Sequence, residues 1–144
     1  MQPARRLVRI AAFALLIPLT ACQSAPASPH LITIARPAMA GEALFRGEMA
    51  VVRGCVVIKG SRRNSTVLFD PGVTLLPSRN GLHDPLSGKD IPFGQLISGG
   101  GGVLRNNGRG WPISDIERFY GVTISAACPK GDIIRLRNFE VLEG

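Results

Sequence analysis

The sequence predicts a small, mainly β domain, with a partly open, OB-like β-barrel as the leading architecture and a β-sandwich as the alternative. The chain has 144 residues, which is the length of one domain. It contains 17 Gly and 11 Pro, whereas charged residues make up only 19%. Short apolar runs alternate with turn residues at intervals of roughly ten residues, as in small barrels and sandwiches.

The first segment is typical of an export signal. Arg5, Arg6 and Arg9 precede an apolar run from Ile10 to Leu19. This run of about ten residues is shorter than the roughly 20 residues that a membrane-spanning helix needs. The segment is therefore predicted to direct export.

The residues Leu19, Thr20, Ala21 and Cys22 follow the apolar run. In this order they resemble the lipobox of bacterial lipoproteins. The resemblance implies that residues 1–21 are a signal peptide, that cleavage falls between Ala21 and Cys22, and that acyl chains are attached at Cys22. Because Asp does not follow Cys22, it also implies an outer-membrane location facing the periplasm of a Gram-negative cell. Ordinary secretion and an uncleaved anchor are the alternatives.

Cleavage after Ala21 would change the charge balance of the chain. The removed segment contains 3 of the 17 Lys and Arg and none of the 10 Asp and Glu, so that the net charge falls from +7 to +4. The remaining cations are scattered along the sequence. A nucleic-acid-binding surface requires a clustered basic stripe with stacking aromatics, so we expect no nucleic-acid partner.

The mature chain divides into a predicted lipid-anchored tether at residues 22–42 and a β-rich domain at residues 43–144. Within the tether, residues 31–35 are at best a short edge strand because Pro and Gly follow. The strands predicted in the domain are Leu44–Val52, Cys55–Lys59, Thr66–Phe69, Val73–Leu76, Pro92–Ile97, Val103–Leu104, Val122–Ala126 and Ile133–Leu142. The run from Gly99 to Gly102 is predicted to form a wide bulge or a mobile hairpin loop.

One short helix is predicted before residue 121. Ser114 and Glu117 have the spacing of a capping box, and Gly121 is placed to end the helix. Apolar residues at spacings of three and four, Ile116, Phe119 and Tyr120, predict one buried face. We therefore expect the helix to cover the sheet.

Cys55 and Cys128 are the cysteines that remain once Cys22 is lipidated. Export would place them in an oxidising compartment, where thiols pair as disulfides. A bond between Cys55 and Cys128 is therefore predicted, with two separate buried thiols as the alternative.

The region from residue 44 to about residue 129 is similar to a recurring type of small secreted or lipid-anchored bacterial β-domain. The residues that carry this resemblance are Gly54–Ile58, Leu68–Gly72, Ile97–Gly102 and Cys128–Pro129. The resemblance implies a β fold with a disulfide, and no catalytic activity is attached to it.

One cluster is a candidate binding site for a polar or sugar-like ligand, or for a protein. It contains Arg105, Asn106, Asn107, Arg109 and Trp111 in a Gly-rich stretch. Trp and Arg are favoured anchors at interfaces, and Trp flanked by Arg and Asn suits recognition of a polar or sugar-like ligand. The alternative is that Trp111 is a core residue packed against the following helix.

The histidines suggest neither a metal site nor a strong catalytic site. His30 and His83 have no partner at the spacing of metal ligands, so no metal or cofactor is predicted. A hydrolytic set of His83, Asp84 and Ser78 or Ser87 lacks the usual nucleophile motif and is the weakest alternative. We therefore expect a non-enzymatic, lipid-anchored envelope protein with a structural or protein-interaction role. The alternative is a module that binds a small or polymeric envelope ligand such as a glycan.

Overall fold

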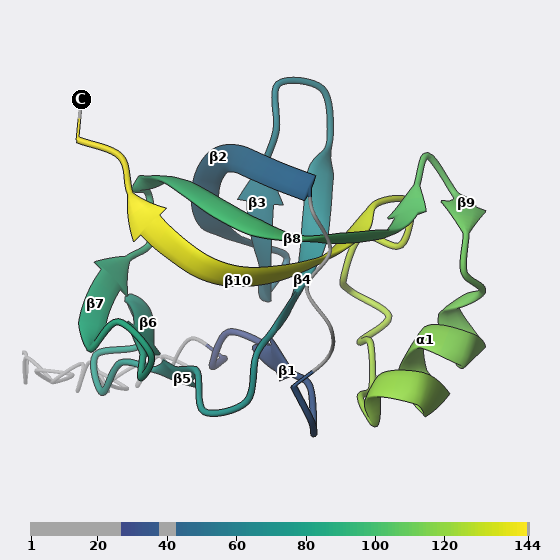
Figure 1. Cartoon of the computed structure of the whole chain (residues 1–144), viewed down its shortest axis with the longest axis horizontal. Helices are drawn as coiled ribbons and strands as arrows, with labels where there is room; N and C mark the ends of the chain where they lie inside the picture. Colours follow the sequence, from purple (N-terminus) through teal and green to yellow (C-terminus); the bar gives the residue numbers. More distant parts are fainter. Residues whose placement is uncertain (1–26, 38–42, 144) are drawn as a thin grey trace, which may run out of the picture.

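The computed structural model describes residues 27–37 and 43–143, and these form a mainly β domain (Figure 1). The larger sheet contains β1 (Ile32–Thr33), β2 (Ala43–Val52), β3 (Cys55–Lys59), β4 (Asn64–Phe69), β8 (Leu96–Asn106), β9 (Arg109–Gly110) and β10 (Ile133–Val141). A smaller sheet contains β5 (Thr74–Leu75), β6 (Gly81–Asp84) and β7 (Lys89–Pro92). A single helix, α1 (Ile113–Tyr120), occurs in the described residues. The predicted mainly β fold class is confirmed.

Five strands of the larger sheet form a partly closed barrel. β4 pairs in parallel with β10. Next to β10 in the sheet lie β8, then β2, then β3, each paired antiparallel with its neighbour. β3 then pairs with β4, so that the hydrogen-bonded path returns to its first strand. β1 lies outside this ring and pairs in parallel with β4. A small, incompletely closed barrel agrees with the predicted OB-like architecture.

Two hydrophobic cores stabilise the barrel, one on each face of its strands. The inner core contains Met49, Val56, Ile58, Val67, Phe69, Val73, Leu82, Ile91, Ile97, Ile134, Leu136 and Phe139. The outer core contains Ile32, Ile34, Ala50, Cys55, Val57, Leu68, Leu104, Ile116, Ile124, Cys128 and Ile133. Successive residues of β3 point into different cores, which explains why four consecutive residues from Cys55 are apolar and buried.

Part of the predicted tether belongs to the folded domain. Ile32 pairs with Leu68 of β4, and both Ile32 and Ile34 are buried in the outer core. His30 forms an isolated parallel bridge with Cys55. The folded region therefore begins before residue 43, because two isoleucines at strand spacing cover the outer face of β4.

The run from Gly99 to Gly102 is not a mobile hairpin loop, which was one of the two predicted forms. A shift in register does occur beside it, because Gly99 alone faces the two residues between Arg137 and Glu140 of β10. The run lies at the centre of β8 and pairs with β2 on one side and β10 on the other. A Cβ atom on Gly99 would lie 2.8 Å from the Leu136 side chain, and one on Gly101 would lie 1.7 Å from the Arg135 carbonyl oxygen. Glycine is therefore required where the neighbouring strand approaches β8 closely.

Two other predicted strands are also wrong. Residues 92–97 span the turn between β7 and β8, where Gly94 adopts φ 93° and its N–H donates to the Met49 carbonyl oxygen at 2.7 Å. Residues 122–126 form no strand. Ile124 is instead buried in the outer core, and its N–H donates to the Glu117 carboxylate at 2.8 Å. β6 and β7 were not predicted, because neither has a long apolar run.

The helix lies close to its predicted position but begins differently. Its N-cap is Pro112, no side chain caps the first turn, and Ser114 lies within the helix. The predicted capping box is therefore wrong. Gly121 ends the helix as predicted, with φ 65°. Of the predicted apolar face, Ile116 is fully buried but Phe119 is exposed, so α1 covers the sheet with only part of that face.

The predicted disulfide between Cys55 and Cys128 is confirmed, with the two Cα atoms 5.3 Å apart. Both cysteines are buried in the outer core. The bond joins the start of β3 to the loop that follows α1, and so it fastens this loop to the barrel. No helix within the described ranges is long and apolar enough to cross a membrane.

Candidate functional site

An open groove of about 700 Å³ lies between α1 and the segment that follows β1. One side contains Trp111 and the last turn of α1, and the other contains residues 35–37. The two sides are joined by a backbone hydrogen bond from the Ala35 N–H to the Tyr120 carbonyl oxygen, at 3.2 Å. Arg135 of β10 also lines the groove. The groove therefore depends on residues that are distant in the sequence.

Three aromatic side chains form a cluster along the groove. The ring centroids of Trp111 and Phe119 are 5.3 Å apart, and those of Phe119 and Tyr120 are 4.9 Å apart, both in edge-to-face geometry. Trp111 is 41% exposed and Phe119 is 66% exposed. The Trp111 ring is therefore neither a core residue nor isolated, and the cluster presents apolar rings to solvent.

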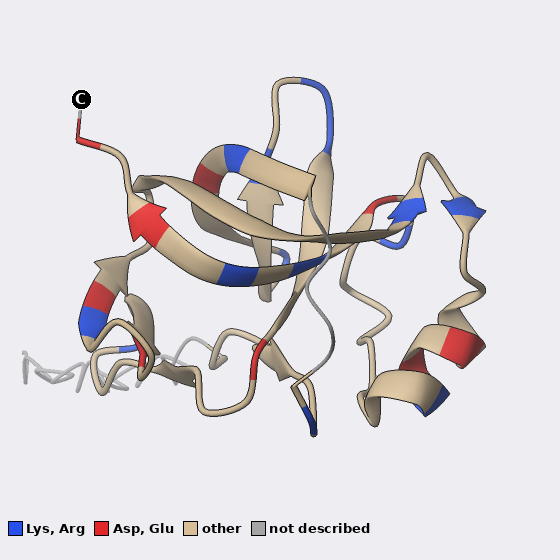
Figure 2. Cartoon of the chain, viewed as in Figure 1, with Lys and Arg blue, Asp and Glu red and all other residues tan. Residues whose placement is uncertain are grey.

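Three arginines accompany these aromatic rings in the groove lining. Arg36 follows β1, Arg118 lies on α1, and Arg135 lies on β10. Arg118 pairs with Asp115 one turn away, on a helix that carries residues of both charges (Figure 2). Among the residues that the structure describes, none of those lining the groove is acidic. Arg36 and Arg118 are exposed, and Arg135 is buried. The groove thus combines aromatic faces with positive charge, which favours a ligand with an anionic group beside an apolar part.

Arg105 builds the loop that carries Trp111. Its guanidinium donates to the carbonyl oxygens of Gly108, Lys130 and Trp111, at 2.6 Å for Trp111. A planar guanidinium with several donors in fixed directions is suited to holding separate carbonyl groups. Arg105 was predicted to contact a ligand, and in the structure three of its N–H groups donate to backbone carbonyl oxygens. These bonds hold the loop that carries Trp111, and Arg105 does not line the groove.

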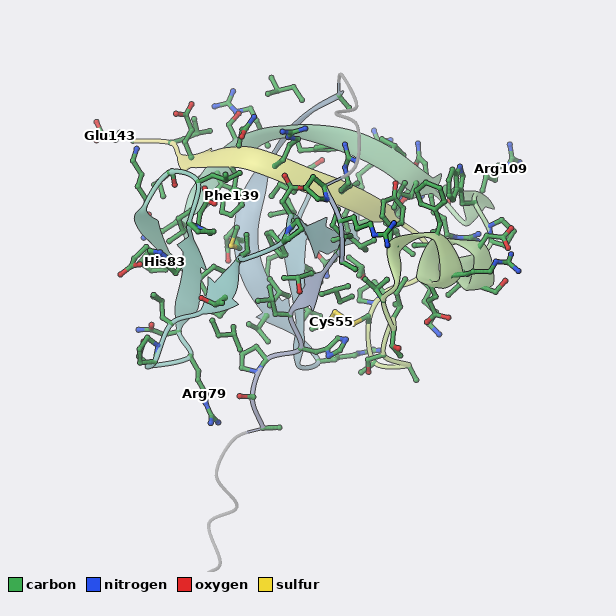
Figure 3. The ribbon with its side chains drawn as sticks, turned by 60° about the horizontal axis from the view of Figure 1, so that its bottom comes forward. Cys55, Arg79, His83, Arg109, Phe139 and Glu143 are labelled. Carbon is green, nitrogen blue, oxygen red and sulfur yellow. A yellow bond between two sulfur atoms is a disulfide. The ribbon has the colours of Figure 1, made fainter. Side chains whose placement is uncertain are left out.

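Asn107 and Arg109, which were predicted to bind a ligand, do not line the groove. Asn107 adopts φ 50° in the turn between β8 and β9, and its N–H donates to the Asp132 carboxylate at 2.7 Å. Asp132 also pairs with Arg63 at 2.9 Å. Arg109 is exposed on β9, at the α1 end of the domain (Figure 3). Of the predicted cluster, only Trp111 lines the groove.

Three groove residues were missed by sequence reasoning. Phe119 was expected to be buried, and Arg36 and Arg118 were counted only among scattered cations. Arg118 and Phe119 could have been found from the sequence, because they lie in the short helix α1 that begins just after Trp111. Arg36 carries no such signal, because only the pairing of β1 with β4 brings it to α1.

The residues of the weakest alternative, a hydrolytic set, make other contacts. His83 Nδ1 lies 2.7 Å from an Asp90 carboxylate oxygen, on the neighbouring strand β7. The Asp84 carboxylate accepts hydrogen bonds from the Ser87 hydroxyl, at 2.8 Å, and from the Leu86 N–H. Ser87 therefore stabilises the turn between β6 and β7 and is not directed at His83.

Ala21 and Cys22 lie outside the described residues. Among the residues that the structure describes, no group of three or more His, Cys, Asp or Glu is placed to hold a metal ion. Comparison of the chain with protein-family models, with curated proteins and with solved structures finds no match.

Proposed function

We propose that this chain is an exported, lipid-anchored protein of the cell envelope that acts as a non-enzymatic binding domain. The anchor is Cys22, and the binding site is the groove beside α1. This proposal favours the ligand-binding module over a purely structural role. The exposed aromatic cluster in a positively charged groove is the observation that carries it.

The exposure of these rings is costly unless they contact something. Phe119 and Trp111 lie beside each other at an open surface, although burial of a large aromatic side chain favours folding by about 2 kcal/mol. Clustered exposed aromatics beside arginines have the composition of binding surfaces. Export and the Cys55–Cys128 bond are mutually consistent, because disulfides persist outside the reducing cytoplasm.

Site-specific photo-crosslinking in cells tests the binding site. A photoreactive residue at Phe119 should give discrete adducts in the full-length exported protein, and mass spectrometry identifies the attached molecule. Leu86 is the matched control because it is also 66% exposed but belongs to the turn between β6 and β7. Equal labelling at the two positions would remove the argument for a specific site beside α1.

Metabolic labelling with palmitate tests the anchor separately. Label is expected in the wild type and not in Cys22→Ser, with the labelled protein in the outer-membrane fraction. Wild-type protein that is unlabelled and soluble would rule out the anchor, but it would leave the groove as the site of a freely secreted binding domain.

A further inference from the structure

We infer that the groove binds the anionic phospholipid headgroups of the leaflet that holds the lipid anchor. The inference rests on the proposed function, and it names the ligand of the same groove. The domain would then contact the membrane twice, through acyl chains at Cys22 and through the side chains beside α1.

The length of the tether keeps the domain close to the leaflet. His30 lies eight positions after Cys22, and an extended chain over eight such steps spans at most about 28 Å. His30 is fixed to the barrel, because its carbonyl oxygen accepts the Val56 N–H at 3.1 Å. The point where the tether joins the barrel therefore stays within about 28 Å of the lipidated Cys22 at the leaflet.

The tether joins the domain near both walls of the groove in the sequence. His30 Nε2 lies 3.2 Å from the Thr123 carbonyl oxygen, two residues after Gly121, which lines the groove and ends α1. The other wall, residues 35–37, follows β1 in the segment that begins at His30. A domain held close to the leaflet at His30 therefore keeps the groove within reach of the headgroups.

The groove side chains have the chemistry of a lipid interface. Aromatic rings are favoured at the boundary between headgroups and acyl chains, and Arg bonds phosphate through paired donors. Phe119 and Trp111 would insert at that boundary, while Arg36 and Arg118 lie beside them in the groove to contact phosphate. Each cation close to an anionic leaflet raises binding by about fivefold.

Both ends of the domain carry charges of both signs. Lys89 and Asp90 adjoin on β7, and α1 carries Asp115 and Glu117 beside Arg118 (Figure 2). The attraction to an anionic leaflet therefore depends on the groove lining, where Arg36 and Arg118 accompany the aromatic rings.

Trp111 is the only Trp of the chain and so reports on the groove directly. The test uses the full lipidated protein in vesicles of phosphatidylcholine, with and without phosphatidylglycerol. Because the acyl chains hold the protein on both vesicles, any difference in Trp111 emission or in acrylamide quenching comes from the domain. We expect a blue shift and protection from acrylamide only with phosphatidylglycerol, both reversed near 1 M salt, where the screening length is about 3 Å.

A double variant and a charge-matched control identify the residues responsible. Arg36→Gln with Arg118→Gln removes two exposed groove cations and should lower the ratio of docked to undocked protein by about 25-fold. Arg62→Gln with Lys89→Gln removes two exposed cations outside the groove and should leave the protection of Trp111 unchanged.

Equal accessibility of Trp111 on the two kinds of vesicle would overturn headgroup binding, as would equal loss of protection in the two double variants.

A second probe, the soluble anionic polysaccharide heparin, shows whether such a result rejects only the lipid ligand or also the proposed binding groove. Protection of Trp111 by heparin would keep the binding groove and reject only the lipid. No effect of either probe would reject both. Protein that carries no acyl chain and does not remain on the vesicles would reject the anchor and with it the inference.

Discussion

At the end of the barrel that β5–β7 cover, the strands turn apolar side chains into the core and an exposed leucine, Leu86, lies on a turn, whereas at the α1 end the exposed aromatic rings form a cluster. Leu82 and Ile91 of the small sheet are fully buried in the inner core. At the other end, Ile116 is buried, but Phe119 and Trp111 face the groove. Each end has a cover that closes part of the core. The difference is that β5–β7 contribute buried side chains to the core, while α1 both buries Ile116 and carries part of the exposed aromatic cluster on which the proposed binding site rests.

Removing the disulfide should have the largest effect and should fall mainly on the α1 end. Cys55→Ala with Cys128→Ala opens a loop whose ends are 73 residues apart, which lowers the free energy of unfolding by about 4 kcal/mol. Urea denaturation of oxidised wild type and of the double variant measures this loss. Hydrogen exchange should show earlier opening of residues 122–128 than of β6. Uniform opening of both ends would contradict the comparison.

Truncating one apolar residue at each end should give opposite results. Leu82→Ala leaves a cavity in the inner core and should cost about 3 kcal/mol. Phe119→Ala removes an exposed ring and should change stability by less than about 0.5 kcal/mol. Both are measured by urea denaturation. A large loss for Phe119→Ala would mean that the aromatic cluster is structural.

Arg105→Lys should have a smaller effect that is confined to the groove. Lysine keeps the charge but cannot hold three carbonyl groups in a plane, so the loop loses about 1.5 kcal/mol. Trp111 fluorescence should shift, because its carbonyl group is one of the three acceptors. Arg109→Lys, on exposed β9, is the control and should leave the emission spectrum unchanged.

Two glycines with similar backbone angles allow the smallest and most closely matched test. Gly121 has φ 65° at the end of α1, and Gly88 has φ 67° in the turn between β6 and β7. Alanine at either position should cost about 1 kcal/mol in thermal unfolding. Only Gly121→Ala should also change Trp111 fluorescence, since Gly121 lines the groove. A change in emission with Gly88→Ala would show that the two ends are coupled.

The strands that could be predicted are those whose own side chains specify them. β2, β3 and β10 contain β-branched and other apolar residues at suitable spacing, and the predicted ranges differ from the observed ones by at most one residue at either end. Gly121, which ends the helix, was identified for the same local reason. The fold class followed from these local signals.

The centre of β8 and the groove could not be predicted, because both are determined by distant partners. A strand of consecutive glycines has no side-chain pattern, and only the close approach of β10 and the Phe45 ring explains it. The groove needs Arg36 from the N-terminal segment beside Arg118 of α1. Trp111 was identified, but the loop that carries it is held by Arg105, whose guanidinium donates to three backbone carbonyl oxygens.

The glycine-rich centre of β8 also determines when the barrel can form. Glycine has low strand propensity and offers no side chain for early hydrophobic contacts, so β8 requires β2 and β10 on either side. β10 is the last of the described strands, and its parallel partner β4 lies far upstream, which makes the pairing slow. The barrel therefore closes only after β10 is available. A chain that enters a compartment with its N-terminus first would keep β2, β4 and β8 without their full set of partners until β10 had followed them.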